Sequence, residues 1–542
     1  MVKIKRLVAL ILLAIIVLTS FSCQNTDNKK KQNTEVDLVI NATVNVPENI
    51  TADFTQYMGT NKKPYKPLGE IFSLKTNRNY AFKDKISYVF DEYIYIVNGI
   101  IFAPASGLSE MFGLEYKTSE DKNSAEITYN DLKVTLTASA DTINVNGTDV
   151  PFITTIKQND TLLLAAEAFA KATGYNFYYD SYTKISYMST QKEITEDIMA
   201  SAEKNYELYE NVVYNYENVE CDQTGVGLFE KSKPEDRLVG IAYSTWHRMT
   251  ATWDSGTWST PLIGRYASNK SEAIAQHGKW LADADVDFVF VDWSNNTGYV
   301  PETMSKLRPD FRMIEEATDI LFEEWAKIPN APKICIFVGP GHNGPDSVKN
   351  GSHQRKVDQV YRDYIENEKN KDMYFYYEGK PLLMCYGATP TQYGEIPSWN
   401  DDRFTIRWVT GFVGQQPSLF NKETLQSHKY WSWEERGTQT YTVSNGVVEA
   451  VTCSAATRSQ GKPGGSGYIP ESGRKDGATF KKQFQRAMDL GAKIVLIVSW
   501  NEWNKGEQPS EEISKDIEPS KAHGTFYYDL MKEQIKKFKG KK

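Results

Sequence analysis

One short stretch near the C-terminus restricts the possible folds of this chain more than any other. An apolar run, Ile494–Val498, is followed almost at once by Trp500-Asn-Glu-Trp503. The run is too short to span a membrane and is rich in β-branched residues, which predicts a strand buried on both faces, as in a parallel sheet. In barrels of parallel strands, the residues at the C-terminal strand ends carry the chemistry. Glu502 is therefore a candidate catalytic carboxylate, and a buried glutamate in a structural ion pair is the alternative.

Residues 237–542 repeat this pattern, with strand-like runs separated by amphipathic segments. The eight candidate strands are Leu238–Tyr243, Asp287–Val291, Lys333–Val338, Pro381–Tyr386, Arg403–Val409, Tyr430–Trp433, Val447–Thr452 and Ile494–Val498. Eight strands in about three hundred residues predict an α/β fold, a (β/α)8 TIM barrel. A doubly wound open sheet is the alternative. No glycine-rich phosphate-binding fingerprint follows any of the strands, which argues against the nucleotide-binding version of that sheet.

Residues 88–190 have a different pattern, which predicts a small α+β domain before the barrel. Asn98-Gly99 and Asn146-Gly147 are typical of tight hairpin turns. Helices are expected at 108–113 and 162–173, each ended by a glycine. The repeated order of hairpin, helix and strand suggests two similar halves and resembles the copper amine oxidase N-terminal-like domain. That resemblance implies a spacing or binding module without copper, since the segment has no histidine. An unrelated α+β module is the alternative.

Two further segments are expected to flank the α+β domain. Residues 23–87 are predicted to form an irregular lead-in, which begins with a polar, lysine-rich tether at 24–34. Residues 191–236 are predicted to form a helical linker, because a helical pattern at 198–213 is followed by a polar stretch with glycine and proline.

Residues 1–22 have the pattern of a signal peptide: basic residues, an apolar stretch at 7–18, and small residues before Cys23. A cysteine in this position resembles the lipobox of bacterial lipoproteins, in which that cysteine becomes acylated and N-terminal. We therefore expect an exported protein that is anchored at the bacterial cell envelope or surface, with the membrane as a partner through a lipid on Cys23. An ordinary cleaved signal with an incidental cysteine is the alternative. The net charge of −8 gives no reason to expect a nucleic-acid partner.

Four further cysteines occur after Cys23, namely Cys221, Cys335, Cys385 and Cys453. Cys335 and Cys385 lie inside strand-like apolar runs, and none of the four has the spacing of metal ligands. We therefore expect buried free thiols, no metal site and no cofactor.

Polar and aromatic residues gather at the predicted C-terminal strand ends. The polar set is His247, Asp292, Asn295, His342, Glu434, Asn501 and Glu502, and the aromatic set is Trp246, Trp293, Trp433, Trp500 and Trp503. Indole faces suit the C–H faces of sugars, and glycosidic cleavage needs two carboxylates, one as acid and one as nucleophile or base. The alternatives are packing for the tryptophans and hydrogen-bonded rim positions for the histidines.

The C-terminal motif resembles a known group of barrels. Trp500-Asn-Glu-Trp503, then Ile517-Glu-Pro-Ser520, Gly524 and Tyr527-Tyr528 are similar to the ending of glycoside hydrolase family 99-like proteins. This group includes endo-α-mannosidases, the related family 71 α-glucanases and relatives from lipopolysaccharide biosynthesis. Val289–Trp293 and Gly379–Leu383 resemble two other stretches of that superfamily. The resemblance spans most of residues 237–540 and implies a carbohydrate substrate.

Two departures separate the chain from the mannosidase branch. In that branch the catalytic pair lies in a Glu-Pro motif after a central strand, and the corresponding stretch here, Phe337–His342, has no carboxylate. Residues 504–516 also look inserted between the two halves of the terminal motif. The catalytic pair of that branch is therefore not carried over. The catalytic candidates, Asp292 and Glu502 followed by Glu434 and Glu518, rest on their strand-end positions.

These observations favour a surface-anchored glycoside hydrolase that cleaves a polysaccharide or glycan by a two-carboxylate acid/base mechanism. The alternative is a non-catalytic glycan-binding lipoprotein on the same barrel, which the missing carboxylates after Phe337 favour. A purely structural cell-envelope protein would leave the tryptophans at the strand ends unexplained.

Overall fold

The computed structural model describes residues 37–58, 70–214, 219–254, 256–294, 296, 309–339, 344–387, 399–411, 413–437, 439–459, 463, 469–506 and 508–541. These residues form two compact units, one within 1–83 and 88–203 and the other within 84–87 and 204–542. Each unit has a hydrophobic core of its own.

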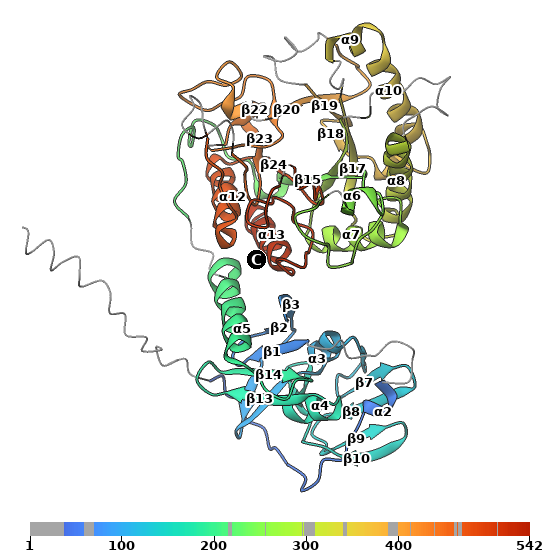
Figure 1. Ribbon diagram of the computed structural model, residues 1–542, viewed down its shortest axis with the longest axis vertical. Helices are drawn as coiled ribbons and strands as arrows, with labels where there is room; N and C mark the ends of the chain where they lie inside the picture. Colours follow the sequence, from blue (N-terminus) through green and yellow to red (C-terminus); the bar gives the residue numbers. More distant parts are fainter. Residues whose placement is uncertain are drawn as a thin grey trace, which may run out of the picture. The chain divides into compact units, whose positions relative to one another are not determined.

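In the described part of the first unit, three antiparallel sheets pack with the helices α3 (Ala105–Phe112) and α4 (Ala166–Ala172) (Figure 1). The first sheet has the order β13 (Asn176–Asp180), β14 (Ile185–Ser189), β1 (Ile71–Lys75), β2 (Tyr80–Lys83), β3 (Ile86–Val89). The second has the order β10 (Thr148–Pro151), β9 (Thr142–Val145), β8 (Leu132–Thr137), β7 (Ser124–Tyr129), β6 (Glu115–Thr118). The third has the order β11 (Ile156–Gln158), β12 (Thr161–Ala165), β5 (Ile100–Pro104), β4 (Tyr95–Val97).

The two predicted halves are present in this unit. Hairpin β4–β5, helix α3 and hairpin β6–β7 correspond to hairpin β11–β12, helix α4 and hairpin β13–β14. The Asn98-Gly99 and Asn146-Gly147 turns join β4 to β5 and β9 to β10, and both residues of each turn have positive φ. A tight two-residue hairpin of this kind needs positive φ at both positions, which explains the Asn-Gly pairs.

Two predictions for this unit differ from the structure. The lead-in is not irregular throughout, because residues 71–75 and 80–83 form β1 and β2. The helix expected at 162–173 begins only at Ala166, and the three leucines before it belong to strand β12. Leucine favours helices when considered alone, but here Leu163 and Leu164 pair with β5 and are completely buried. Tertiary pairing therefore overrides local helix propensity.

The helical pattern predicted at 198–213 is confirmed by α5 (Glu196–Leu208) and a π-helical turn, η1 (Tyr209–Tyr214). Within the described ranges, no helix is both long and apolar enough to cross a bilayer. Residues 1–36, which include the predicted signal peptide and Cys23, lie outside the described residues.

Among the described residues of the second unit, eight strands run parallel and follow one another around a nearly closed barrel (Figure 1). They are β15 (Leu238–Tyr243), β16 (Phe288–Trp293), β17 (Lys333–Val338), β19 (Lys380–Tyr386), β20 (Thr405–Thr410), β21 (Trp431–Ser432), β23 (Val447–Cys453) and β24 (Ile494–Ile497). β24 pairs with both β23 and β15, so the last strand lies next to the first. Two short strands, β18 (Tyr376–Tyr377) and β22 (Tyr441–Ser444), pair antiparallel with β19 and β23. The predicted TIM-like barrel is therefore confirmed.

Side chains complete the barrel between β21 and β23, where the backbone ladder is interrupted. Trp431 Nε1 donates a hydrogen bond of 2.9 Å to Glu449 Oε2. The Thr452 hydroxyl donates to the backbone oxygen of Ser432. These bonds connect the two strands across the position where ladder hydrogen bonds would otherwise lie.

The barrel interior is filled by every second residue of its strands. One buried cluster contains Phe288 and Phe290 of β16, Phe337 of β17 and Met384 of β19, with Trp433 packed against it. Because side chains alternate along a strand, the neighbours of these residues face the surrounding helices. The same alternation decides which polar residues at the strand ends face the barrel axis.

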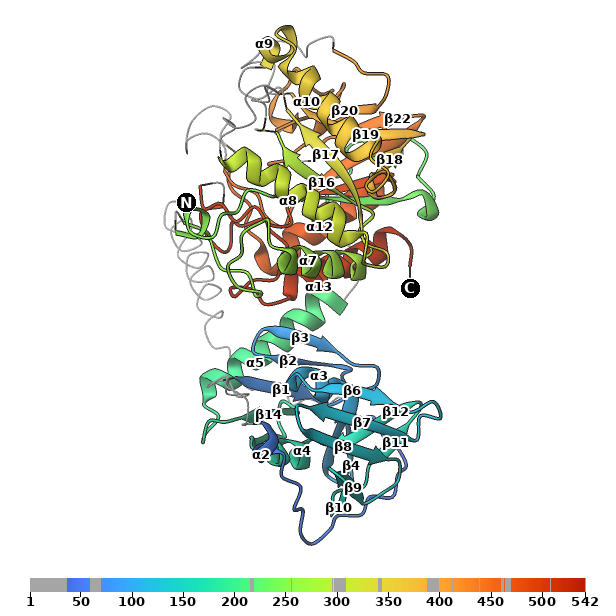
Figure 2. The same ribbon diagram turned by 90° about the vertical axis from the view of Figure 1, so that its right-hand side faces the viewer.

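Helices lie around the outside of the strands in both views (Figure 1, Figure 2). They are α7 (Ser271–Asp283), α8 (Pro309–Trp325), α10 (Ser352–Val360), α12 (Ala478–Leu490) and α13 (Phe526–Phe538). The cysteines Cys221, Cys335, Cys385 and Cys453 are all buried free thiols, as predicted.

Candidate active site

A buried lysine joins two of the predicted carboxylates. Lys515 Nζ lies 2.8 Å from Glu502 Oε2 and 3.3 Å from Glu434 Oε2. Glu434 follows β21 and Glu502 follows β24, which are the sixth and the eighth of the eight parallel strands. Since both distances end at the same nitrogen, the two oxygens are no more than about 6 Å apart. We refer to Glu434, Glu502 and Lys515 as the Lys515 cluster.

Asp292 continues an inward-facing row of β16 towards this cluster. Phe288 and Phe290 belong to the barrel interior, and Asp292 is the next residue of the same alternation. Its Oδ1 accepts a hydrogen bond of 2.8 Å from the backbone N–H of Ser294. Burial raises the pKa of the Asp292 carboxyl, while hydrogen bonding from Ser294 and the charge of Lys515 partly offset this rise. Asp292 is thus close enough to Lys515 to respond to its charge.

Asp516 holds the backbone of the Trp500–Trp503 motif in place. Its carboxylate accepts hydrogen bonds of 2.7 Å from the backbone N–H groups of both Glu502 and Trp503. It also accepts one of 2.8 Å from Trp258 Nε1 and one of 2.8 Å from Gln508 Nε2. Hydrogen bonds to a charged acceptor are among the strong ones, so this buried carboxylate fixes where the Glu502 side chain begins.

Asn501 and His247 form hydrogen bonds that connect the Trp500–Trp503 motif to the loop after β15. The Asn501 side chain accepts from the Ser244 N–H at 2.8 Å and donates to the Ser244 oxygen at 3.1 Å. His247 Nε2 donates to the Asn501 backbone oxygen at 2.6 Å. Burial lowers the pKa of His247, which favours the neutral imidazole. Both side chains have no exposed surface, so the structure gives them positioning roles rather than direct contact with a sugar.

Glu518 is surrounded by donors away from solvent. Tyr266 OH and Trp503 Nε1 donate to its Oε2 at 2.7 and 2.8 Å, and His277 Nε2 lies 2.9 Å from its Oε1. The side chain is completely buried. These contacts occupy both carboxylate oxygens. We therefore assign Glu518 to positioning Trp503 rather than to bond cleavage.

The five predicted tryptophans fall into two groups. Trp293, Trp500 and Trp503 have no exposed surface. Trp293 donates to Thr318 of α8, and Trp503 stacks on Trp258 with ring centroids 4.8 Å apart, so both pack the wall around the barrel. Their burial leaves no indole face for a ligand. These three tryptophans are therefore packing residues in this structure, which was the alternative to sugar binding.

Trp246 and Trp433 are only partly buried. Trp433 stacks on Phe337 with ring centroids 5.3 Å apart and planes 14° apart, at the end of the barrel interior beside Glu434. One face of this indole is thus held by Phe337. Trp433 is therefore the best-positioned aromatic platform beside the Lys515 cluster.

Asn295 and His342, also predicted to contact substrate, lie outside the described residues. Within the part of the chain that the structure describes, no group of three or more His, Cys, Asp or Glu side chains is arranged to hold a metal ion.

Glu435, which the sequence reasoning did not single out, is a second buried acid beside Glu434. Its Oε2 accepts from the Gly414 N–H at 3.0 Å, and its Oε1 accepts from the Thr440 N–H at 3.1 Å and from the Thr440 hydroxyl. Burial raises the pKa of Glu435 to about 7, although these hydrogen bonds oppose the rise. The carboxyl connects two loops at the strand ends and helps to hold the segment that carries Glu434.

Lys515 and Asp516 were also missed, because residues 504–516 resemble an insertion and not a strand end. A signal was nevertheless present: a Lys-Asp pair stands directly before the Ile517-Glu-Pro-Ser520 half of the terminal motif.

Strand alternation also distinguishes between two of the predicted site residues of β16. Asp292 and Trp293 are adjacent, so only one of them can face the barrel axis.

The N-terminal unit contains a recognised domain. Residues 82–194 match the family model of the copper amine oxidase N-terminal domain. The resemblance predicted for residues 88–190 is therefore confirmed. No curated protein matches the chain.

The barrel has similar solved structures. Two structures of the family 99 endo-α-mannosidase from Bacteroides thetaiotaomicron are 16% and 14% identical to this chain, with TM-scores of 0.38 and 0.37. Each covers 56% of this chain and 98% of its own. A glycoside hydrolase-like protein is 15% identical, with a TM-score of 0.35, and covers 58% of this chain and 98% of its own. At these identities and TM-scores, the likeness identifies neither a family nor an activity for this chain.

Proposed function

We propose that the barrel is a glycoside hydrolase that cleaves a polysaccharide or glycan, with Asp292 as proton donor and Glu502 as nucleophile or base. One observation supports this proposal above the others: two similarly buried carboxylates at the C-terminal strand ends differ in their contacts, since Glu502 pairs with a lysine and Asp292, among the described residues, has no ion pair. Burial favours the neutral form of Asp292, whereas the Lys515 ammonium at 2.8 Å favours the ionised form of Glu502. Two carboxyl groups whose environments differ in this way can take the acid and base roles.

The proposed reaction uses each group in the form that its environment favours. Protonated Asp292 donates its proton to the glycosidic oxygen as the bond to the anomeric carbon breaks. The Glu502 carboxylate either adds to that carbon or removes a proton from the water that does so. Glu434 shares Lys515 and holds the ammonium beside Glu502. Asp516 keeps the Glu502 backbone in position through its hydrogen bond of 2.7 Å.

Trp433 is proposed to bind the sugar ring next to the scissile bond, with Trp246 at the rim. Both indoles are partly exposed, and Trp433 precedes Glu434 directly in the chain. An indole face offers apolar contact to the C–H groups of a pyranose, while the neighbouring carboxylates accept hydrogen bonds from its hydroxyls.

The test is hydrolysis of a polysaccharide panel by the full chain, with Glu502→Gln and Asp292→Asn run alongside. We expect release of reducing ends by the parent protein and loss of cleavage in both variants, with glycan binding retained. Glu511→Gln is the matched control, because Glu511 is exposed and lies in the same segment as Lys515. Unchanged cleavage in either active-site variant would refute the assigned roles, and binding without cleavage in the parent protein would refute the hydrolase.

A non-catalytic glycan receptor is the second candidate. The observation that favours it is the ion pair itself, since a lysine that neutralises nearby carboxylates also describes a structural cluster. The same panel separates the two functions, because a receptor binds a glycan that the parent protein never cleaves.

We further propose that the protein is exported and anchored to a bacterial envelope membrane through a lipid on Cys23. The support is the signal-peptide pattern of residues 1–22 and the position of the cysteine directly after it. The mass of the mature N-terminal peptide tests this: a diacylglyceryl group on Cys23 is expected, and Cys23→Ser should move the protein to the soluble fraction. A mature N-terminus elsewhere in the chain, without lipid, would contradict the anchor.

A further inference from the structure

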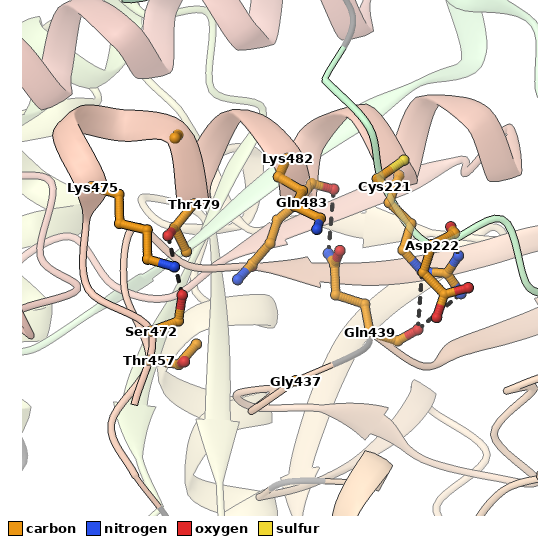
Figure 3. Close-up of a pocket in the computed structure, with 12 residues that line it drawn as sticks. Cys221, Asp222, Gly437, Gln439, Thr457, Ser472, Lys475, Thr479, Lys482 and Gln483 are labelled. Carbon is orange, nitrogen blue, oxygen red and sulfur yellow. Dashed lines mark hydrogen bonds between the residues drawn. The ribbon is translucent and has the colours of Figure 1, made fainter. Parts of the chain in front are cut away.

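A pocket of about 350 Å³ lies beside α12, apart from the Lys515 cluster. Its walls come from four segments: Cys221–Asp222, the loop that contains Gln439, the connection after β23, and residues of α12 up to Arg486 (Figure 3). This volume is within the range of small-molecule sites, about 300–1,000 Å³. The pocket is thus larger than a single inorganic ion requires.

The pocket carries two lysine ammonium groups, and a carboxylate lies beside the first lysine: Glu512 Oε1 accepts a hydrogen bond of 2.8 Å from the Lys475 backbone N–H. Lys475 and Lys482 line it, and Figure 3 shows both side chains extending from the helical segment towards the space above Ser472 and Thr457. Within the described residues, neither ammonium group takes part in a hydrogen bond or an ion pair.

The third basic residue of the lining is already satisfied. Arg486 donates to the backbone oxygens of Gln439, Asp222 and Thr224. Asp222 lies beside it and offsets its charge. Among the lining residues, the net excess of positive charge therefore comes from the two lysines and would attract a negatively charged group.

A buried hydroxyl provides a second, independent observation. Thr457 is only 2% exposed, and its Oγ1 has no hydrogen-bond partner among the described residues. Ser472 and Thr479, also in the lining, lie within 3.2 Å of each other through their hydroxyl oxygens. Leaving a buried hydroxyl unpaired is unfavourable, and a ligand with hydroxyl groups would supply the missing partner.

We propose that this pocket binds the uronic acid unit of an acidic glycan, with the carboxylate between Lys475 and Lys482 and the sugar hydroxyls at Thr457, Ser472 and Thr479. The preference for an anion rests on the pocket alone, whereas the choice of a sugar rests on the proposed function. Gln439 of the lining follows the segment that carries Glu434 and Glu435. A bound uronate would therefore contact the loop that also carries these two carboxylates.

Isothermal titration of the full chain with a short glucuronate or galacturonate oligomer tests the proposal, with a neutral oligomer of equal length and inorganic sulfate as comparison ligands. We expect the uronate oligomer to bind at least tenfold more tightly than either. The double variant Lys475→Gln/Lys482→Gln should lose at least tenfold of that affinity. Added salt should weaken it, because both ammonium groups are exposed at the pocket rim.

The matched control is Lys279→Gln/Lys369→Gln, which removes the same charge from two exposed lysines outside the lining and should bind as the parent does. Equal affinity for the neutral oligomer, equal affinity for sulfate, or unchanged binding in the pocket variant would overturn the proposal. Titration measures binding and not cleavage. A barrel without hydrolase activity could therefore still bind uronate here, and an active hydrolase could fail to do so.

Discussion

Replacing Lys515 by methionine should destabilise the barrel. The ammonium lies 2.8 Å from Glu502 and 3.3 Å from Glu434. At an effective dielectric constant of about 20, each of these attractions amounts to about 5–6 kcal/mol. The desolvation of three buried charges offsets much of that energy. Removal of one partner from a buried ion pair costs about 3–5 kcal/mol, because it leaves uncompensated charge behind.

This loss can be converted into a melting temperature. Unfolding entropy is about 2.1 cal/mol/K per residue, so a unit of roughly 340 residues should lose about 4–7 °C for a loss of 3–5 kcal/mol. The two carboxylates are no more than about 6 Å apart and repel each other once the lysine is gone.

Differential scanning calorimetry of the parent and the Lys515→Met variant at neutral pH measures the effect. Lys521→Met is the control, because Lys521 is exposed and its loss should cost less than about 0.5 kcal/mol. The double variant Glu434→Gln/Lys515→Met removes one of the two facing charges and should recover part of the loss. A decrease of less than about 1 °C in the single variant, or no recovery in the double variant, would refute the assigned electrostatic role.

Four further predictions concern single side chains. If Asp292 is the acid, Asp292→Asn should lose about 10²–10⁴-fold on polysaccharide but much less on aryl glycosides with good leaving groups, whereas Glu502→Gln should lose both activities. Because burial raises the pKa of Glu435 from 4.5 to about 7, its stabilising contribution is greatest below pH 4.5 and falls by about 3 kcal/mol by pH 7. Glu435→Gln should therefore lack this part of the pH dependence in calorimetry, and an unchanged dependence would contradict the assignment. Asp516→Asn places an amide against the Glu502 and Trp503 N–H groups, so kcat should fall more than KM rises, with a stability loss of about 1–3 kcal/mol. Trp433→Ala removes the platform held by Phe337 and should raise KM about two- to tenfold; an unchanged KM would contradict its contact with sugar.

Much of the barrel was predictable because its local signals are strong and consistent. Each parallel strand is a short, apolar, β-branched run, and such runs have few other uses in a chain of this composition. The Asn-Gly turns were equally informative, because positive φ at two successive positions strongly restricts the choice of residues. The segment at 162–164 was not predictable in this way, since its strand state depends on pairing with β5.

The candidate site was only partly predictable. Strand-end position suggested Glu434 and Glu502, which share Lys515 in the structure, and Asp292, whose raised pKa is partly offset by the charge of the same lysine. It also suggested tryptophans that turned out to be fully buried. Trp293 follows Asp292 directly, so an inward Asp292 sends Trp293 outward to Thr318.

The sequence by itself determined the order of the elements, the barrel class and the acidic strand ends, because these follow from local residue patterns and their period. Only the tertiary structure decided which side chains meet. Lys515 reaches Glu434 across 81 positions of the chain, and the Ser244–Asn501 hydrogen bond joins residues 257 apart. Such contacts depend on closure of the barrel, which brings β24 next to β15, and on the register that sets each side chain inward or outward. Neither can be read from any local stretch of the sequence.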